Sequence, residues 1–458
     1  MNRTFGVFLL TIMVSSLLLA GGSLVGVTTA STPENGIISQ NTTWSETNSP
    51  YTLTGPVGIA KEATLTIEPG VTVNIGEFYL EVNGTLNAQG TTTEQISFNS
   101  NNQYAGPPNN YNSLSNSPDN IFLGYDNPTC IIENAILNNT SINGDSYVSN
   151  ATVTVVNCSL KGDSEIAVGG SATISSSTIE GAVLLRGAST VTGNTFLGGI
   201  NIAGGSYTPV AAGTYLISGN NITNQQGNDV IIAGDAGNVS CNIIWGGNNA
   251  GIRRSGYPIG KTIIEKNLVI NNQFGILIDR ADDNSTIQDN TITNNIVGIK
   301  NPTSRQTITG NNIYNNSQYN IQAGSNGATA TLANNYWGTT DQTAISNSIY
   351  DSKNDFNLGT VTFTPFLTSP NNQAEPTNTQ FPTPIPTSPM PAQSTVPTEA
   401  TSSENPTTVP TGSSNGTNQP FNWVEIGIFV LLAVIAVLLA AILVSIRKNK
   451  ISKNPAIS

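Results

Sequence analysis

Histidine is completely absent from this 458-residue sequence. Without histidine, the chain cannot build a Ser-His-Asp triad, an imidazole metal site or an acid-base step that depends on an imidazole. Methionine is nearly absent as well, because Met1, Met13 and Met390 are the only three, so a Met-rich copper site is excluded. These absences remove several classes of metalloprotein and hydrolase before any motif is considered.

Charged residues are also scarce, at 10% of the chain against about 25% in an average soluble domain. Asn, Thr, Ser and Gly take their place, with 44 glycines in total. Such a composition favours turns over helices. The net charge of −12 would repel a phosphate backbone, so we exclude a nucleic-acid-binding function.

The first 30 residues have the pattern of a secretory signal peptide. They begin with Arg3, continue as an apolar run from Phe5 to Ala20 and end in small residues. A basic start, an apolar core and a small-residue end are typical of segments that are removed on export. We predict a signal peptide over residues 1–30, and an uncleaved N-terminal anchor is the alternative.

A second apolar segment predicts a membrane anchor near the C-terminus. Residues 426–446 carry no charge, and a helix of that length reaches about 32 Å, enough to cross a bilayer core. Trp423 precedes this segment and four basic residues follow it, and positive charge beside a span stays in the cytoplasm. We predict a transmembrane helix over 423–446 and a cytoplasmic basic tail over 447–458. The chain is then a single-pass cell-membrane protein with an extracellular N-terminal domain.

A Pro/Ser/Thr-rich linker, residues 369–422, lies between the body and this anchor. It holds 11 of the 24 prolines and neither Lys nor Arg, so it cannot bury enough apolar surface to fold. Such mixtures are typical of O-glycosylated stalks, and a plain disordered linker is the alternative. The exported part also contains eleven Asn-x-Ser/Thr motifs, which predict a glycoprotein.

The body of the chain contains an internal repeat. An aliphatic residue, two variable residues, Asn, another variable residue and an aliphatic or aromatic residue recur, as in IEKNLVIN at 264–271 and IQDNTITN at 287–294. The ten copies have a mean spacing of about 22 residues, which is typical of a solenoid. The fourth position of the copies falls at Asn134, Cys158, Ser177, Asn194, Asn220, Asn242, Asn267, Asn290, Asn311 and Asn335.

A second short strand follows each of these anchors, for example at 200–202 and 276–278. Apolar residues at i and i+2 in such short pieces indicate strands. We therefore predict a coil in which each strand pairs in parallel with its copy one turn later, about 4.8 Å away. One predicted inward column contains Ile131, Ile217, Ile264, Ile287 and Ile308. The Asn anchors are expected to adopt left-handed backbone angles at the bends and to form a ladder of stacked amides.

With this repeat, the chain resembles the right-handed parallel β-helix proteins of the pectate-lyase-like superfamily, and in particular their surface-anchored prokaryotic members. The opening LTIEPGVTVNIG at 65–76 is similar to the first coils of such domains, and NNYWGTTD at 334–341 is similar to a closing element. The resemblance covers roughly residues 37–368. It implies an all-β right-handed parallel β-helix domain over 31–368, with roughly twelve coils and a length of about 60 Å.

The same resemblance implies chemistry on uronic-acid polysaccharides. Lyases of the superfamily use Ca²⁺ held by acids together with a basic residue, and its hydrolases use clustered Asp. The outward column of the second strand is predicted to contain no acid, because it reads Asn201, Ile231, Arg253, Leu277, Lys300 and Gln322. We therefore expect a non-enzymatic adhesin, glycan-binding module or envelope component. A tethered polysaccharide lyase or hydrolase is the alternative, while a relative of the copper-delivery β-helix proteins is excluded because His and Met ligands are missing.

Asp279, Asp282 and Asp283 are the candidate metal ligands, because they cluster in one loop and carboxylate oxygens suit Ca²⁺. Solvated loop acids are the alternative interpretation. No other cofactor is predicted.

Seven of the eleven exported basic residues lie within 53 positions. Among them, Arg253 and Lys300 are predicted to lie two coils, or roughly 10 Å, apart on one face, with Arg254 beside them. This face is a candidate site for an acidic extracellular polysaccharide, although ordinary solvation of polar coils gives the same pattern. A surface protein is another possible partner.

The insertion Asn101–Asn120 is long for a turn of a coil, and long loops on rigid scaffolds often carry binding residues. Its Tyr104 and Tyr111 could stack on sugar rings, and a plain insertion is the alternative. The three cysteines, Cys130, Cys158 and Cys241, are expected to be small buried hydrophobic residues.

Overall fold

The computed structural model describes residues 31–376, apart from 102–119, 145–149, 203–214, 225–226, 228, 235, 256–259, 281 and 326. The predicted signal peptide, transmembrane helix and basic tail, and most of the predicted linker, lie outside the described residues. Among the residues that are described, no helix combines the length and apolar character needed to span a bilayer.

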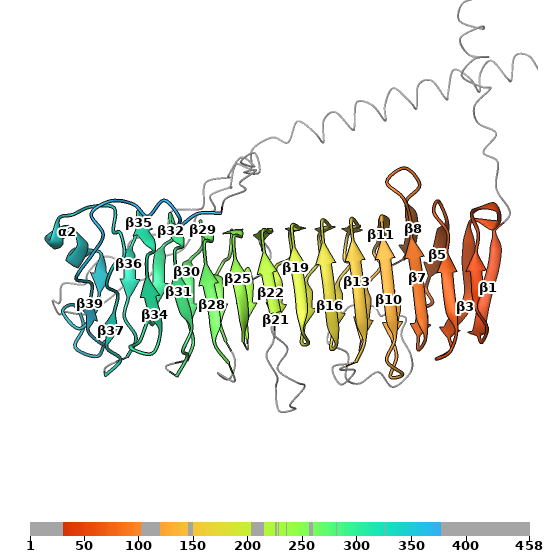
Figure 1. Cartoon of the computed structure of the whole chain (residues 1–458), viewed down its shortest axis with the longest axis horizontal. Coiled ribbons are helices and arrows are strands. Elements are labelled where there is room, and N and C mark those ends of the chain that lie inside the picture. Colours follow the sequence, from red (N-terminus) through yellow and green to blue (C-terminus); the bar gives the residue numbers. More distant parts are fainter. Residues whose placement is uncertain are drawn as a thin grey trace, which may run out of the picture. The chain divides into compact units, whose positions relative to one another are not determined.

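The described chain folds as a parallel β-helix whose coils are stacked in a row from β1 to α2 (Figure 1). Each coil contributes up to three short strands, and every pairing between named strands is parallel. We call the three resulting stacks the first, second and third face, in the order in which the chain visits them. The first face contains twelve strands, so the stack is roughly 50 Å long at about 4.8 Å per coil.

The strands of the first face are β2 (Thr42–Trp44), β4 (Thr64–Ile67), β7 (Thr85–Gln89), β10 (Thr129–Glu133), β13 (Thr152–Val156), β16 (Ser171–Ser175), β19 (Ser189–Thr192), β22 (Tyr215–Ser218), β25 (Gly237–Ser240), β28 (Thr262–Glu265), β31 (Thr286–Gln288) and β34 (Thr307–Thr309). The second face contains β5 (Thr72–Gly76), β8 (Ile96–Ser100), β11 (Ala135–Asn138), β14 (Ser159–Lys161), β17 (Thr178–Ile179), β20 (Thr195–Phe196), β23 (Asn221–Thr223), β26 (Ile243–Trp245), β29 (Leu268–Ile270), β32 (Thr291–Thr293) and β35 (Asn312–Tyr314).

The third face contains β6 (Leu80–Val82), β9 (Ile121–Leu123), β12 (Ile142–Gly144), β15 (Ile166–Val168), β18 (Val183–Leu185), β21 (Ile200–Ile202), β24 (Ile231–Ala233), β27 (Ala250–Arg254), β30 (Phe274–Ile278), β33 (Val297–Lys300), β36 (Tyr319–Gln322) and β38 (Ile349–Tyr350). At the N-terminal end, the strands β1 (Thr32–Ile38) and β3 (Tyr51–Ile59) are long enough to belong to two faces. The first part of each strand lies on the second face and the last part lies on the third face.

Alternating burial along these strands explains why the sequence folds this way. In β4 and β13, for example, every second side chain is buried, and the residues between them face outward. Stacking places the buried members of successive coils in contact, and they form one continuous hydrophobic core. The predicted all-β parallel solenoid is confirmed.

The left-handed residue at the bend after the first face is not the predicted one. Positive φ occurs at the position before each ladder Asn, for example 66° at Gly219, 55° at Lys266 and 53° at Asp289. The prediction assigned this conformation to the Asn anchors themselves, which is wrong for these ladder residues and right for Asn134, whose φ is 49°. The left-handed residue makes the bend, which leaves the next side chain pointing into the coil.

Seven of the predicted anchor residues form a buried ladder of side-chain amides. The Asn267 side chain is typical: its Nδ2 donates to Asn290 Oδ1 at 2.9 Å and to the Val239 carbonyl of the preceding coil at 2.8 Å. Its Oδ1 accepts from both the main chain and the side chain of Asn242, at 3.0 Å each. The members of this ladder are Asn194, Asn220, Asn242, Asn267, Asn290, Asn311 and Asn335.

The prediction was one residue off in the coil that contains β10. Strand pairing aligns Asn134 with Asn157 rather than with Cys158, so Ala135 occupies the ladder position there. Asn134 is instead left-handed, with φ of 49°. For the same reason Ile131 faces outward and Ile132 joins the inward column. Two adjacent isoleucines precede this bend, and the repeat alone does not separate them.

A second amide ladder, which the sequence analysis missed, lies between the second and third faces. Asn272 Nδ2 donates to Asn295 Oδ1 at 3.0 Å, and Asn295 Nδ2 donates to Asn316 Oδ1 at 3.1 Å. Each of these residues directly follows a left-handed Asn, such as Asn271 with φ of 56°. The repeat contains Asn at both positions, and only the three-dimensional stacking separates the bend residue from the ladder residue.

The two ends of the stack differ from the regular coils between them. At the N-terminal end, the rings of Trp44 and Tyr51 stack at 4.8 Å between centroids, next to the short 3-10 helix η1 (Glu46–Asn48). The C-terminal closing element, predicted from NNYWGTTD, contains α2 (Gln342–Asn347), β37 (Ala330–Thr331) and β39 (Val361–Thr362). Asp341 caps α2 by accepting from the main-chain N–H of Thr343 at 2.8 Å.

The folded body extends beyond the predicted boundary at residue 368. Asn371 donates through Nδ2 to Asp289 Oδ1 at 2.8 Å and to the Gly310 carbonyl at 2.7 Å. Its main-chain N–H also donates to Asn312 Oδ1 at 2.8 Å, and Ala374 is buried. The polar composition of 369–376 suggested a linker, but Asn371 bonds to the coils through both its main chain and its side chain.

Cys130 and Cys158 are free thiols buried in the core, whereas Cys241 is half-buried. Burial, and secondarily the neighbouring Cys158, raises the pKa of Cys130 from 9.0 to about 12. Burial likewise raises the pKa of Cys158 to about 11. The folded chain therefore holds both thiols protonated at pH values where the unfolded chain ionises them.

This difference predicts a loss of stability at high pH. Above pH 9 the unfolded chain releases thiol protons that the folded chain keeps, so the free energy of unfolding falls as pH rises toward about 12. We expect the Cys130→Ala variant to show a shallower decline than the wild type when urea unfolding is measured from pH 8 to 11. Identical slopes for the two proteins would contradict this prediction.

Candidate functional site

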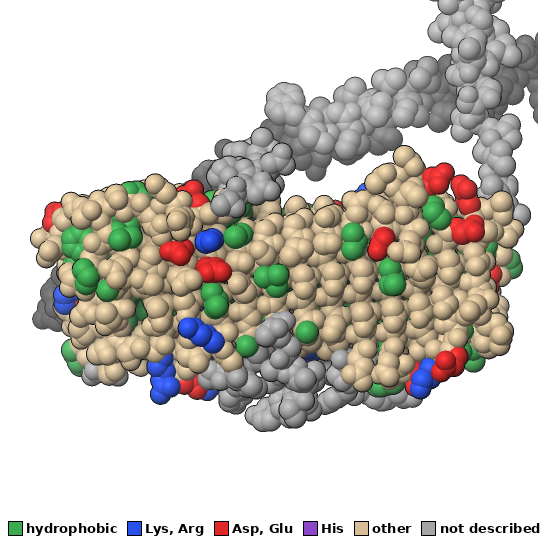
Figure 2. All heavy atoms as spheres, viewed as in Figure 1, with side chains coloured by type: hydrophobic (Ala, Val, Ile, Leu, Met, Phe, Trp, Pro, Cys, Tyr) green, Lys and Arg blue, Asp and Glu red, His purple; other side chains and the backbone are tan. Residues whose placement is uncertain are grey.

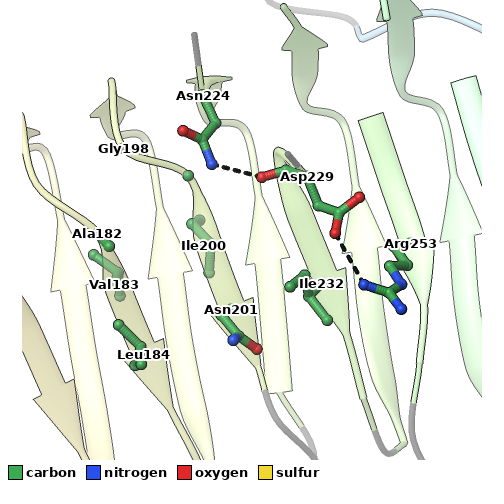
Figure 3. A pocket seen from close by; sticks show the side chains of 11 residues that line it. Ala182, Val183, Leu184, Gly198, Ile200, Asn201, Asn224, Asp229, Ile232 and Arg253 are labelled. Atoms are coloured by element: carbon green, nitrogen blue, oxygen red, sulfur yellow. Dashed lines mark hydrogen bonds and ion pairs between the residues drawn. The ribbon is translucent and has the colours of Figure 1, made fainter. Parts of the chain in front are cut away.

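A groove of about 370 Å³ lies on the third face and crosses four successive coils (Figure 3). Outward side chains of β18, β21, β24 and β27 form its floor and one end: Leu184, Asn201, Ile232 and Arg253. Strand pairing keeps these four residues in one row, because outward positions of parallel strands stack directly on each other. The row continues through Leu277 and Lys300 to Gln322.

This row agrees with the predicted outward column except at one residue. Ile231 was predicted to face outward, but it is buried and pairs with the inward Ile252, while Ile232 occupies the row. Both neighbours are isoleucine, so composition could not decide which of them faces the core.

The upper wall of the groove is a turn between the second and third faces. Asn224 Nδ2 donates to the Asp229 carbonyl at 2.7 Å, which holds the turn together. Gly199 has a φ of 77°, and a Cβ there would lie 2.8 Å from the Val230 carbonyl, so a larger residue would not fit. The sequence analysis missed both residues: Asp229 lies between strands where the repeat gives no signal, and Asn224 is the last position of the repeat copy at 217–224 but was not singled out.

Asp229 is the most firmly held group of the groove. Its Oδ1 accepts from Asn249 Nδ2 at 2.8 Å and from the main-chain N–H of Ala250 at 3.2 Å. Its Oδ2 accepts from Arg253 Nη1 at 3.2 Å, and its side chain is only 4% exposed. With both oxygens occupied, Asp229 orients Arg253 rather than offering a free carboxylate.

Arg253 lies between two carboxylates. Besides Asp229, it contacts Asp279, whose Oδ2 accepts from Arg253 Nε at 2.6 Å. Burial opposes the charged form of the guanidinium, but the bonds to Asp279 and Asp229 outweigh it and raise the pKa of Arg253. The remaining N–H groups of Arg253, whose side chain is 37% exposed, have no partner among the described residues.

Arg254, predicted as a binding residue, is instead part of the interior. Its side chain is 4% exposed, and its Nη2 lies 2.9 Å from Oδ1 of Asp283, which is 5% exposed. It also donates to the carbonyls of Ala233 and Gly234 in the preceding coil. Alternation explains the correction: Arg253 faces outward, so the next residue in the strand faces inward.

The three predicted metal ligands are not brought together. Asp279 pairs with Arg253, Asp282 pairs with Arg280, and Asp283 pairs with Arg254. No group of three or more Cys, Asp or Glu side chains able to hold a metal ion lies within the described ranges. Each of the three carboxylates is thus bound to a different guanidinium.

Lys300 lies in the outward row two coils from Arg253, with Leu277 between them. Its Nζ is 4.1 Å from the centroid of the Phe274 ring, a cation–π contact on the preceding coil. On the predicted basic face, Lys300 therefore has no ion pair among the described residues, whereas the Arg253 guanidinium is paired with two acids. Tyr104 and Tyr111 lie outside the described residues.

The middle of the groove is lined by uncharged side chains. Leu184 and Ile232 are half-buried and offer an apolar floor. Between them, Asn201 is half-buried, and its Oδ1 accepts no hydrogen bond from the described chain. Figure 2 shows a face of the molecule on which charged side chains are few.

No family model matches the chain, and no curated protein matches it. Among solved structures, the chain is similar to the periplasmic alginate epimerase AlgG, with 13% identity and a TM-score of 0.34 over 67% of this chain and 76% of that one. A mutant of AlgG gives 12% identity and a TM-score of 0.29 over 69% and 74%. A likeness at this level carries no argument about activity. The strand pairing of the chain itself establishes the fold: it is a parallel β-helix of the kind that the sequence predicted.

Proposed function

We propose that this protein is a non-enzymatic carbohydrate-binding β-helix. The observation that supports this proposal is the groove on the third face, which combines an apolar floor with the Asn201 Oδ1 and N–H groups of Arg253 that have no partner among the described residues. A sugar ring has the matching chemistry, because its C–H face is apolar and its hydroxyls both donate and accept. Asp229 is saturated and Arg253 is held in ion pairs, so neither is positioned as a free acid-base group.

We further propose that the β-helix acts outside the cell. The expected signal peptide over 1–30, the linker, the transmembrane helix over 423–446 and the basic tail over 447–458 support a cell-surface location. In that setting, a rigid stack held to the membrane by a linker would present its groove to extracellular polysaccharide.

The Asn201→Ala variant tests the groove. The Oδ1 of Asn201 accepts no hydrogen bond from the described residues, so we expect its removal to leave the fold intact. We expect about tenfold weaker binding to the saccharide that the wild type selects from a glycan panel, since about 1.4 kcal/mol is the contribution of a typical ligand hydrogen bond. The control is Thr190→Ala, an exposed position of β19 on the first face, which should bind as the wild type does.

The wild-type protein also allows a test of the alternative that the chain is a polysaccharide lyase or hydrolase. Incubation of the protein with uronate polymers, with and without Ca²⁺, should give no change in polymer length. Unsaturated product would show a polysaccharide lyase, and new reducing ends without unsaturation would show a hydrolase. Unchanged glycan binding by the Asn201→Ala variant would remove the groove from the proposal.

A further inference from the structure

The net charge of the groups around Arg253 affects whether the groove binds neutral or acidic saccharides. One guanidinium faces two carboxylates, at 2.6 Å from Asp279 and 3.2 Å from Asp229, so the three groups together carry one negative charge. At the same time, the free N–H groups of Arg253 can still donate. The site therefore offers hydrogen-bond donors without offering net positive charge.

We propose that the groove selects uncharged saccharides and rejects uronates, with Asp279 as the residue that sets this selectivity. This inference rests on the carbohydrate-binding function proposed above. It replaces the expectation from the sequence that Arg253 and Lys300 bind an acidic polysaccharide.

The physical reason is that a hydroxyl and a carboxylate interact differently with the paired Arg253 guanidinium. A hydroxyl accepts from a free N–H of Arg253 while both ion pairs stay intact. A uronate carboxylate gains little from a guanidinium that is already neutralised, and it is repelled by the Asp279 carboxylate beside it. Lys300 does not compensate, because it lies two coils, or roughly 10 Å, away, and solvent ions screen exposed charges at that separation.

The two acids have different roles. Asp229 is buried and bonded to Asn249 and Ala250, so it positions Arg253, and its removal would disturb the turn. Asp279 is 25% exposed, and its carboxylate bonds to Arg253 alone among the described residues. Asp279 is therefore the acid whose charge can be removed while the groove keeps its shape.

The test compares the full-length wild type with the Asp279→Asn variant. Both are titrated by calorimetry with a neutral oligosaccharide and with an oligouronate of the same length. We expect the wild type to bind the neutral ligand at least tenfold more tightly than the oligouronate. In the variant, the ratio of oligouronate affinity to neutral-ligand affinity should rise about tenfold, and this gain should shrink in high salt.

The matched control is Asp282→Asn, which removes the same charge from the same loop. Asp282 pairs with Arg280, whereas Asp279 pairs with the groove residue Arg253, so the affinity ratio should stay at the wild-type value. A rise equal to that of Asp279→Asn would show a general charge effect and overturn the inference.

The remaining outcomes separate this inference from the proposed function. A wild type that binds the oligouronate as tightly as the neutral ligand, or a variant with an unchanged ratio, overturns the selectivity and leaves carbohydrate binding in place. If neither protein binds either saccharide, both proposals fail.

Discussion

The Arg254→Ala variant is expected to lose about 3–5 kcal/mol of folding free energy, because the substitution leaves the Asp283 carboxylate buried without a counter-charge. The two side chains are 4% and 5% exposed and lie 2.9 Å apart. Asp283 also accepts from the Ser285 hydroxyl at 2.6 Å, so it cannot turn toward solvent without breaking a second contact. Urea unfolding followed by circular dichroism measures the loss.

The control for this prediction is Arg280→Ala. Arg280 pairs with Asp282, and both side chains are substantially exposed, so the unfolding midpoint should stay at the wild-type value. Equal midpoints for Arg254→Ala and Arg280→Ala would contradict the interior role of Arg254. Equal midpoints would instead favour the prediction from the sequence that Arg254 is a binding residue on the surface.

The Asn267→Ala variant is expected to lose about 2–4 kcal/mol, since it removes a central member of the first amide ladder. Five hydrogen bonds of the side chain disappear, three donated by Nδ2 and two accepted by Oδ1. The main-chain N–H of Asn242 and the Val239 carbonyl are then left buried without these partners. The same urea measurement reports the loss.

Two further variants give this prediction its controls. Asn267→Ser should recover part of the loss, because Ser177 occupies the equivalent position in another coil and accepts from the Cys158 N–H at 3.0 Å. Asn238→Ala should have little effect, since Asn238 faces outward and makes one side-chain bond of 3.3 Å to Glu265. If Asn267→Ala and Asn238→Ala lost the same small amount, the ladder would not be what stabilises the bends.

The fold could be predicted from the sequence because its pattern is repeated ten times. A single copy such as ISGNNITN is ambiguous, but aliphatic and Asn positions that recur at one-coil spacing allow only stacked parallel strands. The errors came from single coils in which two equivalent residues are adjacent. Ile131 and Ile132, and Ile231 and Ile232, are the examples, and tertiary packing alone decides which of each pair is buried.

The site could be predicted only in part. The outward row with Arg253 and Lys300 follows from strand alternation, which is local. The acidic partners of Arg253 and Arg254 were not predicted from strand alternation. Their spacing was a usable signal, because Asp279 follows Arg253 by 26 residues and Asp283 follows Arg254 by 29 residues, which is about one coil. Asp229 could not be predicted, because it lies in a turn between strands that does not repeat. Asn224 ends the repeat copy at 217–224, but its place at the groove depends on its bond to Asp229.

The most direct test of the proposed function is a crystal structure of the protein with a neutral oligosaccharide. We expect sugar density on the third face, with a ring over Leu184 and Ile232 and hydroxyls bonded to Asn201 and Arg253. Density on another face, or a cleaved saccharide in the groove, would contradict a non-enzymatic carbohydrate site at this position.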